Sequence, residues 1–497
     1  MLTYKNDQAR TGQNLTETIL TPANVDASDF GLLRGLAVDG KVDAQPLFVS
    51  QLMLSGASHD AAIVATEHDS VYAFDVASGA TLWHVSLLGP GEATSDERGC
   101  QQVSPEIGVT ATPVIDRQAG PRGAIYVVAM SKDNAGQYHQ RLHALDLATG
   151  DELFGGPVDI SATFPVSQGG TATFDPGQYE ERAALLLLNG TLYTSWTSHC
   201  DISPYTGWII AFNAQTLERT AVLDIAPGSS SGPAIWMSGD GPAADSSGNI
   251  YLLSANGAFE TSLDANGFPS GHDYGNSFLK LSTANGLTVA DYFAMSREVA
   301  ESDQDEDLGS GGELLLPDLT DASGVVRHLI VGAGKDGNLY VVDRDGMGKF
   351  DLAANHIWQE LDGVLGGGIF STPAYFNGTL YYGDVGRALK AFTITNAKLS
   401  AAPASQTSAT FAYPGTSPAV SANGSMNAIV WASENTDPAV LHAYDASNLA
   451  HELYNSNQAA GGRDHFGTGN KFIAPTIANG RVLVGTINSV AVFGLLH

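Results

Sequence analysis

The sequence is poor in cysteine and in charge, and it has no long apolar run. Two cysteines occur among 497 residues, and charged residues make up 15% of the chain. No Cys-x-x-Cys pair is present, so neither a thiolate zinc site nor a c-type haem is encoded. No apolar segment reaches the roughly 18 residues that a membrane-spanning helix needs, and no helical period recurs. We therefore expect no membrane insertion and a chain built from strands and turns.

Basic residues are scarce as well. The chain has 23 Lys and Arg against 53 Asp and Glu, which gives a formal net charge of -30. An acidic surface of this kind repels phosphate backbones and anionic headgroups, so we expect no nucleic-acid partner. The sequence shows no basic-then-apolar leader at its start. We expect an extracellular or periplasmic protein whose signal peptide is not part of this sequence.

Glycine is abundant instead, with 56 residues, and it marks the turns of a repeat. In each copy, two strands joined by a tight turn precede a third strand that ends in a motif such as Ala-Phe-Asp. The eight copies start near Ala61, Ala124, Leu185, Gly232, His328, Thr372, Ala428 and Ile473. A four-stranded sheet cannot bury both faces alone, but radially stacked sheets cover one another. The sequence predicts an all-β, eight-bladed β-propeller with four antiparallel strands per blade.

The last copy lacks an outer strand. Residues 31–38 can supply it and close the ring, which removes the exposed sheet edges. We find no linker that divides the chain, so we expect residues 1–497 to form a single domain. Cys100 and Cys200 fall in different blades, and neither has an adjacent partner. We predict that they do not form an essential bridge.

One stretch of the fourth copy contains residue types that can bind a ligand. Residues 243–245 and 250–253 are predicted strands on either side of a Ser-Ser-Gly-Asn turn. Trp236 precedes the first strand and Asn256 follows the second, so an indole and an amide can face one cavity. The alternative is that Trp236 fills the core and that Asn256 belongs to a plain turn.

Two motifs have a known counterpart. Residues 73–83 contain Ala-Phe-Asp-x-x-x-Gly-x-x-x-Trp, and residues 4–12 read Tyr-Lys-Asn-Asp-Gln-Ala-Arg-Thr-Gly. With the repeat count, they resemble the quinoprotein alcohol dehydrogenases, whose propeller binds pyrroloquinoline quinone (PQQ), over nearly the whole chain. In that family two adjacent cysteines form a disulfide over the quinone, and this sequence has no such pair. Glu106 lies in the corresponding segment and is a candidate cofactor contact, or the central acid of another activity.

PQQ is a flat tricarboxylate, and its site needs an aromatic floor, cations, a hard metal ion and a carboxylate base. The resemblance implies that Trp236 is the floor and that Asn256 binds the metal. It also implies that Lys335, in the segment Gly-Lys-Asp-Gly, reaches the quinone oxygens. The alternative for Lys335 is a turn lysine that faces water.

The acidic segment 301–307 corresponds to the place of the family's catalytic base. Asp305 is the better match for that base, with Asp307 close behind. An Asp-x-Asp here resembles the lanthanide-using members, in which the second Asp is a further ligand. Asp201 is the nearest acid to the family's metal-binding glutamate, so Asn256, Asp201, Asp305 and Asp307 are the implied ligands of Ca2+ or a similar hard cation. The alternative is a solvated acidic loop or a structural calcium site.

Three functions stay open at this point. The leading hypothesis is a PQQ-dependent dehydrogenase that oxidises an alcohol or sugar in the central funnel and passes electrons to a separate acceptor. The second is a quinone-free lyase or hydrolase that acts on a polysaccharide or another small substrate through His199, Asp201, Glu106 or His465. The third is a non-catalytic scaffold, against which the polar clusters at corresponding blade ends argue.

Overall fold

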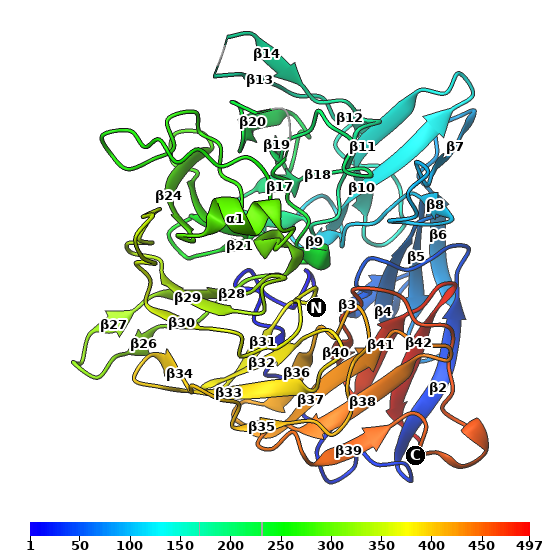
Figure 1. Ribbon diagram of the computed structural model, residues 1–497. Coiled ribbons are helices and arrows are strands. Elements are labelled where there is room, and N and C mark those ends of the chain that lie inside the picture. Colours follow the sequence, from blue (N-terminus) through cyan, green and yellow to red (C-terminus); the bar gives the residue numbers. More distant parts are fainter. Residues whose placement is uncertain (168, 230–231) are drawn as a thin grey trace.

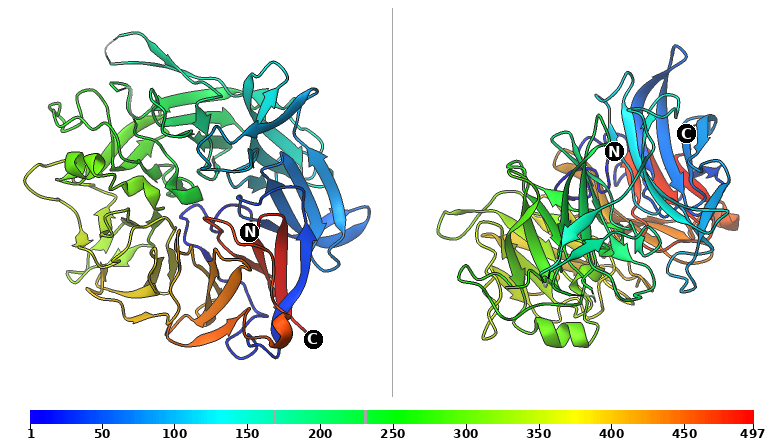
Figure 2. Two further views of the ribbon diagram at one scale, coloured as in Figure 1. Left: turned by 45° about the vertical axis from the view of Figure 1, so that its right-hand side comes forward. Right: turned by 90° about the horizontal axis from the view of Figure 1, so that it is seen from above.

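Eight sheets, antiparallel except for the parallel pairing of the short strand β1 (Gln13–Asn14), stand around a common axis in the computed structural model of the protein, which describes residues 1–167, 169–229 and 232–497 (Figure 1). The sheets follow one another around the ring in sequence order (Figure 2). The predicted eight-bladed propeller is therefore confirmed. No helix in the described ranges is long and apolar enough to cross a membrane.

The first four blades use residues 47–294. Blade one contains β3 (Leu47–Leu54), β4 (Ala57–Thr66), β5 (Ser70–Asp75) and β6 (Thr81–Ser86). Blade two contains β7 (Glu92–Asp96), β8 (Glu106–Ile107), β9 (Val114–Asp116), β10 (Ala124–Asp133), β11 (Tyr138–Asp146) and β12 (Val158–Asp159). Blade three contains β16 (Leu186–Leu188), β17 (Thr191–Ser195), β19 (Trp208–Asn213) and β20 (Arg219–Asp224). Blade four contains β21 (Ala243–Ala244), β22 (Ile250–Leu253), β23 (Ser277–Ser282) and β24 (Thr288–Ala294).

The last four blades complete the ring. Blade five contains β25 (Leu314–Leu315), β28 (Leu329–Gly332), β29 (Leu339–Asp343) and β30 (Gln359–Leu361). Blade six contains β31 (Ala374–Phe376), β32 (Thr379–Gly383), β33 (Leu389–Thr395), β34 (Lys398–Leu399) and β35 (Ser405–Gln406). Blade seven contains β1 (Gln13–Asn14), β36 (Ala419–Asn423), β37 (Met426–Glu434), β38 (Val440–Asp445) and β39 (Glu452–Asn455). Blade eight contains β40 (Thr476–Ala478), β41 (Arg481–Gly485), β42 (Ser489–Leu495) and β2 (Phe30–Ala37).

Short elements lie in the connections. Three two-stranded sheets are β13 (Thr163–Pro165) with β14 (Thr171–Thr173), β15 (Tyr179–Glu180) with β18 (Thr197–Ser198), and β26 (Leu319–Thr320) with β27 (Val326–Arg327). Single 3-10 turns are η1 (Met237–Gly239), η2 (Leu308–Ser310) and η3 (Ala460–Gly462). The helix α1 (Glu298–Asp303) occupies part of the segment that the sequence suggested as an acidic loop. Its six residues are too few to produce a helical period, which is why the sequence pattern did not indicate it.

Burial follows the distance from the axis. Strand β22 in blade four is buried at every position, and so is β28 in blade five. The outer strand β6 has no fully buried residue. Neighbouring blades cover both faces of the inner strands, so the sequences of these strands are continuously apolar. An outer strand, in contrast, has one edge exposed to solvent.

The N-terminal part of the chain closes the ring as predicted. Strand β2 pairs antiparallel with β42, with Leu32 opposite Phe493 and Leu36 opposite Val490. The first residues of the chain lie inside the ring (Figure 2). Backbone amides of Ala244, Leu315, Tyr375 and Val420, each on or next to the inner strand of a blade, donate to the carbonyls of Gln8, Ala9, Thr11 and Gly12. The segment 8–12 thus ties four consecutive blades to one another.

Candidate functional site

A cavity of about 400 Å³ opens where loops of blades two to eight meet, a volume within the range of small-ligand sites. Its lining combines aromatic, charged and amide side chains. They include Gln102, Glu180, Arg182, Asp201, Tyr205, Trp236, Asn256, Asp305, Asp307, Lys335, Phe370, Tyr413, Lys471 and Phe472. Six residues that the sequence singled out are in this lining: Trp236, Asn256, Asp305, Asp307, Lys335 and Asp201.

Four polar residues form what we call the acidic cluster: Asn256, Asp305, Asp307 and Lys335. The Lys335 Nζ lies 2.8 Å from Asp305 Oδ1 and 3.9 Å from Asp307 Oδ2. Asn256 Nδ2 donates to Asp305 Oδ1 at 2.9 Å, and its backbone N–H donates to Asp307 Oδ1 at 3.2 Å. The Trp236 indole N–H donates to Asp307 Oδ2 at 3.1 Å. Both carboxylates are therefore held by donors from other loops.

The repeat explains why these residues meet. Trp236 stands just before the first strand of blade four, and Asn256 follows the second strand, β22. Asp305 and Asp307 lie in the connection from blade four to blade five, and Lys335 follows the second strand of blade five, β28. In an antiparallel blade these connections emerge at the same end, so equivalent positions of neighbouring blades converge on the axis.

The two aspartates differ in their environment. Burial raises the pKa of Asp307 to about 6, although the Lys335 ammonium and the donated hydrogen bonds act in the opposite direction. The Asp305 side chain is 73% exposed. The acidic cluster therefore combines an exposed carboxyl group with a buried one whose pKa is raised by burial.

An aromatic wall borders the acidic cluster. Trp236 lies 6.1 Å, centroid to centroid, from both Phe370 and Phe472. Tyr413 contacts Phe370 at 5.3 Å and Phe472 at 6.5 Å. The sequence analysis recognised only Trp236. A usable signal was present, because all four aromatics occupy the same place, a few residues before the inner strand of their blade.

Two cations form a second group, which we call the basic cluster: Arg182 and Lys471. The Arg182 guanidinium lies 4.5 Å from the centroid of the Phe472 ring, and its Nη1 donates to Glu180 Oε1 at 3.4 Å. Lys471 Nζ donates to the carbonyl of Gln102 at 2.9 Å. Sequence reasoning missed both residues, because they lie in connections between blades that carry no repeat motif.

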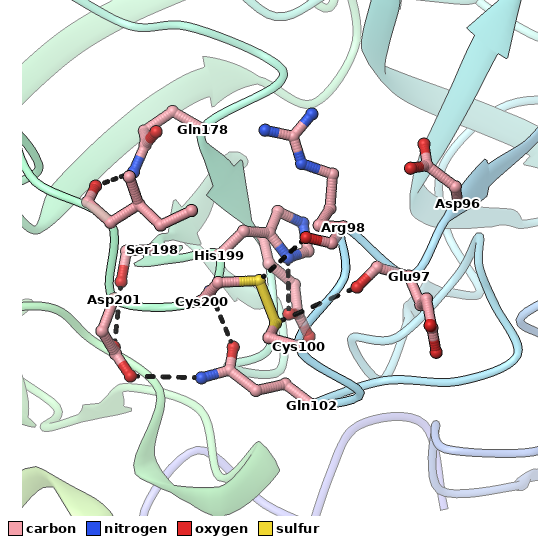
Figure 3. The surroundings of a disulfide bond; sticks show 12 residues. Asp96, Glu97, Arg98, Cys100, Gln102, Gln178, Ser198, His199, Cys200 and Asp201 are labelled. Atoms are coloured by element: carbon pink, nitrogen blue, oxygen red, sulfur yellow. Dashed lines mark hydrogen bonds and ion pairs between the residues drawn. A yellow bond between two sulfur atoms is a disulfide. The ribbon is translucent and has the colours of Figure 1, made fainter.

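A disulfide joins Cys100 and Cys200, with an S–S distance of 2.03 Å, so the prediction that these cysteines form no essential bridge is wrong. They belong to loops of neighbouring blades, and such loops converge at the axis although 100 residues separate the cysteines. Gln102 connects the two loops next to the disulfide. Its side chain accepts a hydrogen bond from Cys200 N at 3.0 Å and donates one to Asp201 Oδ2 at 3.3 Å (Figure 3).

The other predicted residues lie elsewhere or have other partners. Asp201 lines the cavity but binds Gln102 and the hydroxyl of Ser198, at 3.3 Å each. Glu106, His199 and His465 are not in the described cavity lining. Glu106 contacts His68 Nδ1 at 3.0 Å. His199 is buried, 3.5 Å from Glu180, and burial lowers the pKa of its imidazole. His465 is exposed.

The predicted metal ligands are only partly assembled. Asn256, Asp305 and Asp307 come together, and all three are oxygen donors of the kind that hard cations prefer. Asp201 instead contacts the disulfide corner. Within the described ranges, no group of three or more His, Cys, Asp or Glu side chains is arranged to hold a metal ion.

Comparison with known proteins gives a likeness in structure but not in sequence. No family model and no curated protein matches the sequence. The quinohemoprotein alcohol dehydrogenase from Comamonas testosteroni superposes with a TM-score of 0.65 at 16% identity, over 99% of this chain and 80% of that one. The quinohemoprotein alcohol dehydrogenase ADHIIG from Pseudomonas putida HK5 gives 0.65 at 14%, over 99% and 80%. A europium-containing methanol dehydrogenase gives 0.65 at 13%, over 99% and 98%. The suspected quinoprotein-type propeller is thus confirmed as a fold.

Proposed function

We propose that the protein is a PQQ-dependent dehydrogenase that oxidises an alcohol or a sugar in the axial cavity. The observation that supports it most is the convergence of Trp236, Asn256, Asp305, Asp307 and Lys335, which come from separate loops, in one cavity. These are the residue types that a quinone, a hard cation and an alcohol would each require.

The residues present fit a flat anionic cofactor. Trp236 offers an aromatic surface, and Lys335 places an ammonium group beside the Phe370 ring, 5.9 Å from its centroid. Asn256 and Asp305 would hold a hard cation such as Ca2+ through oxygen atoms, which leaves the Asp307 carboxylate free to accept a proton. When bound, the quinone would accept the two electrons of the alcohol, and these would then pass to a separate acceptor.

We assign proton acceptance to Asp307 rather than to Asp305. A general base works best when its pKa lies near the operating pH, and burial raises the pKa of Asp307 to about 6. Trp236 and the Asn256 amide fix the orientation of this carboxylate through the hydrogen bonds described above. Asp305 holds the Lys335 ammonium at 2.8 Å and thereby positions it next to the cavity.

The disulfide supports the expected location. Such bonds form and persist in oxidising compartments and are rare in the cytosol of most organisms. The Cys100–Cys200 bond is therefore consistent with an extracellular or periplasmic protein.

The experiment is a titration of the purified protein with PQQ in the presence of Ca2+, followed by absorbance, and then an assay of dye-linked alcohol oxidation. We expect saturable binding that chelation abolishes before the propeller unfolds. Lys335→Gln should weaken PQQ binding. Lys132→Gln is the matched control, because Lys132 forms a similar surface ion pair with Asp96 at 3.0 Å outside the cavity. Absence of PQQ binding by the wild-type protein would rule out the dehydrogenase.

A further inference from the structure

The basic cluster is unusual in a chain with a net charge of -30. Arg182 is only 7% exposed, and its Nε is buried without a hydrogen-bond partner among the described residues. Its contact with Glu180, at 3.4 Å, is long for a charged pair. Among the described residues, this guanidinium therefore donates one long hydrogen bond, from Nη1, and the residue lines the cavity.

Lys471 is also incompletely paired. Its Nζ donates to the carbonyl of Gln102, and no carboxylate of the described residues lies within ion-pair distance of it. Burial, together with the positive charges of Arg182 and Lys41, lowers the pKa of Lys471. The two cations therefore disfavour each other in this part of the cavity.

Two nearby carboxylates already have cationic or imidazole partners. Glu180 contacts Arg182 and lies 3.5 Å from His199, and Asp43 pairs with Lys41 at 3.0 Å. One positive charge of the basic cluster, that of Lys471, therefore has no carboxylate within ion-pair distance in the described part of the chain. Since a desolvated charge without a partner is costly, an anion would complete the arrangement.

We propose that Arg182 and Lys471 bind a carboxylate of the substrate, so that the oxidised molecule is an acid carrying a hydroxyl group, such as an aromatic hydroxy acid. This inference rests on the proposed function for the hydroxyl chemistry. Arginine pairs with carboxylates through its planar fork. Phe472, stacked under that fork, and Tyr413 beside it offer a surface for a flat or apolar body.

The aromatic wall connects this subsite with the acidic cluster. Phe472 contacts both Arg182 and Trp236, and the Trp236 indole N–H donates to Asp307. A substrate whose carboxylate is held by the basic cluster would extend along Phe472 and Trp236, so its hydroxyl group would lie towards Asp307.

The test uses calorimetric titration of the purified protein with 4-(hydroxymethyl)benzoate and with its neutral analogue 4-(hydroxymethyl)benzamide. We expect the carboxylate to bind at least about tenfold more tightly, as a charge-assisted contact implies. Lys471→Gln and Arg182→Gln should each remove this preference, whereas Lys132→Gln should retain it. Lys471 is half-buried, so its variant serves as the test if the variant of the buried Arg182 fails to fold. Equal binding of the two probes, or an unchanged preference in Lys471→Gln, would overturn the proposal.

A second titration, of protein loaded with PQQ and Ca2+, shows whether the basic cluster binds the substrate or the cofactor. Retained preference for the carboxylate in the loaded protein supports a substrate subsite. If PQQ excludes the carboxylate and Arg182→Gln weakens PQQ binding, the subsite belongs to the cofactor and the proposal is overturned. If PQQ does not bind but the carboxylate preference depends on Lys471, the dehydrogenase fails while the acid-binding subsite stands.

Discussion

The acidic and basic clusters share one cavity but differ in how many of their hydrogen-bonding groups have partners within the protein. In the acidic cluster, Asp307 accepts from Trp236 and Asn256, and Asp305 accepts from Lys335 and Asn256. In the basic cluster, Arg182 keeps a buried Nε without a partner among the described residues. A complete network holds a reactive group in one orientation, whereas an incomplete one leaves binding energy for a ligand. From this difference we assign proton transfer to the acidic cluster and substrate binding to the basic cluster.

The largest effect is expected from Asp307→Asn. An amide cannot accept the hydroxyl proton, so kcat should fall by about 10³-fold, within the range for loss of a general base. Dye-linked oxidation by the PQQ-loaded protein measures this, with circular dichroism as the fold control. Asp305→Asn is the matched variant and should cost less, because Asp305 is exposed and acts through Lys335. A larger loss for Asp305→Asn would reverse the assignment.

The next effect concerns the basic cluster. Arg182→Gln should raise KM for an acidic substrate by about 10–100-fold, the equivalent of one hydrogen bond to a charged group, with kcat nearly unchanged. The neutral analogue should show no such change. Steady-state kinetics with both substrates checks this split. A fall in kcat for both substrates would mean that the two clusters act as one unit.

A pH profile separates the clusters further. Because the pKa of Asp307 is about 6, kcat/KM should fall about tenfold per pH unit below that value as the base becomes protonated. Asp307→Asn should lack this limb, while Lys471→Gln should keep it. A limb that persists in Asp307→Asn would identify a different base.

The same aspartate should affect stability in the opposite direction: a low pH, which reduces activity, should favour the folded state. The folded-state pKa of Asp307 is raised above its usual 3.8, so the folded protein binds more protons between about pH 4 and 6. Its contribution to stability is most favourable at low pH and is lost as the pH rises through 6. At pH 8 the free energy of unfolding of Asp307→Asn should therefore exceed that of the wild type by on the order of 2–3 kcal/mol. Urea denaturation measures this difference, which should vanish near pH 4.

The smallest effect on the cavity is expected from Cys100→Ser with Cys200→Ser. Opening a loop of 100 residues should lower the free energy of unfolding by roughly 2–5 kcal/mol. The bridge holds Gln102, whose carbonyl contacts Lys471, so binding of the acidic probe should weaken a few-fold. PQQ binding should stay unchanged, because the acidic cluster is anchored in other loops. Equal weakening of both ligands would contradict separate anchoring.

The sequence alone determined the propeller. Eight strand-turn-strand copies and the missing outer strand of the last copy are local patterns, so they predicted the blades and the pairing of β2 with β42. The motif matches also selected Trp236, Asn256, Asp305, Asp307 and Lys335, since these residues stand at fixed places relative to the repeated strands.

Only the tertiary structure decided the rest. The bond between Cys100 and Cys200 depends on which loops meet at the axis, and so does the proximity of Arg182 to Lys471; residues in those loops are not periodic. The difference between Asp305 and Asp307 also required the fold. One residue separates them in the sequence, but Asp307 is buried, which raises its pKa, whereas the Asp305 side chain is exposed. Burial is a property of all the blades packed together, and a local sequence pattern does not contain it.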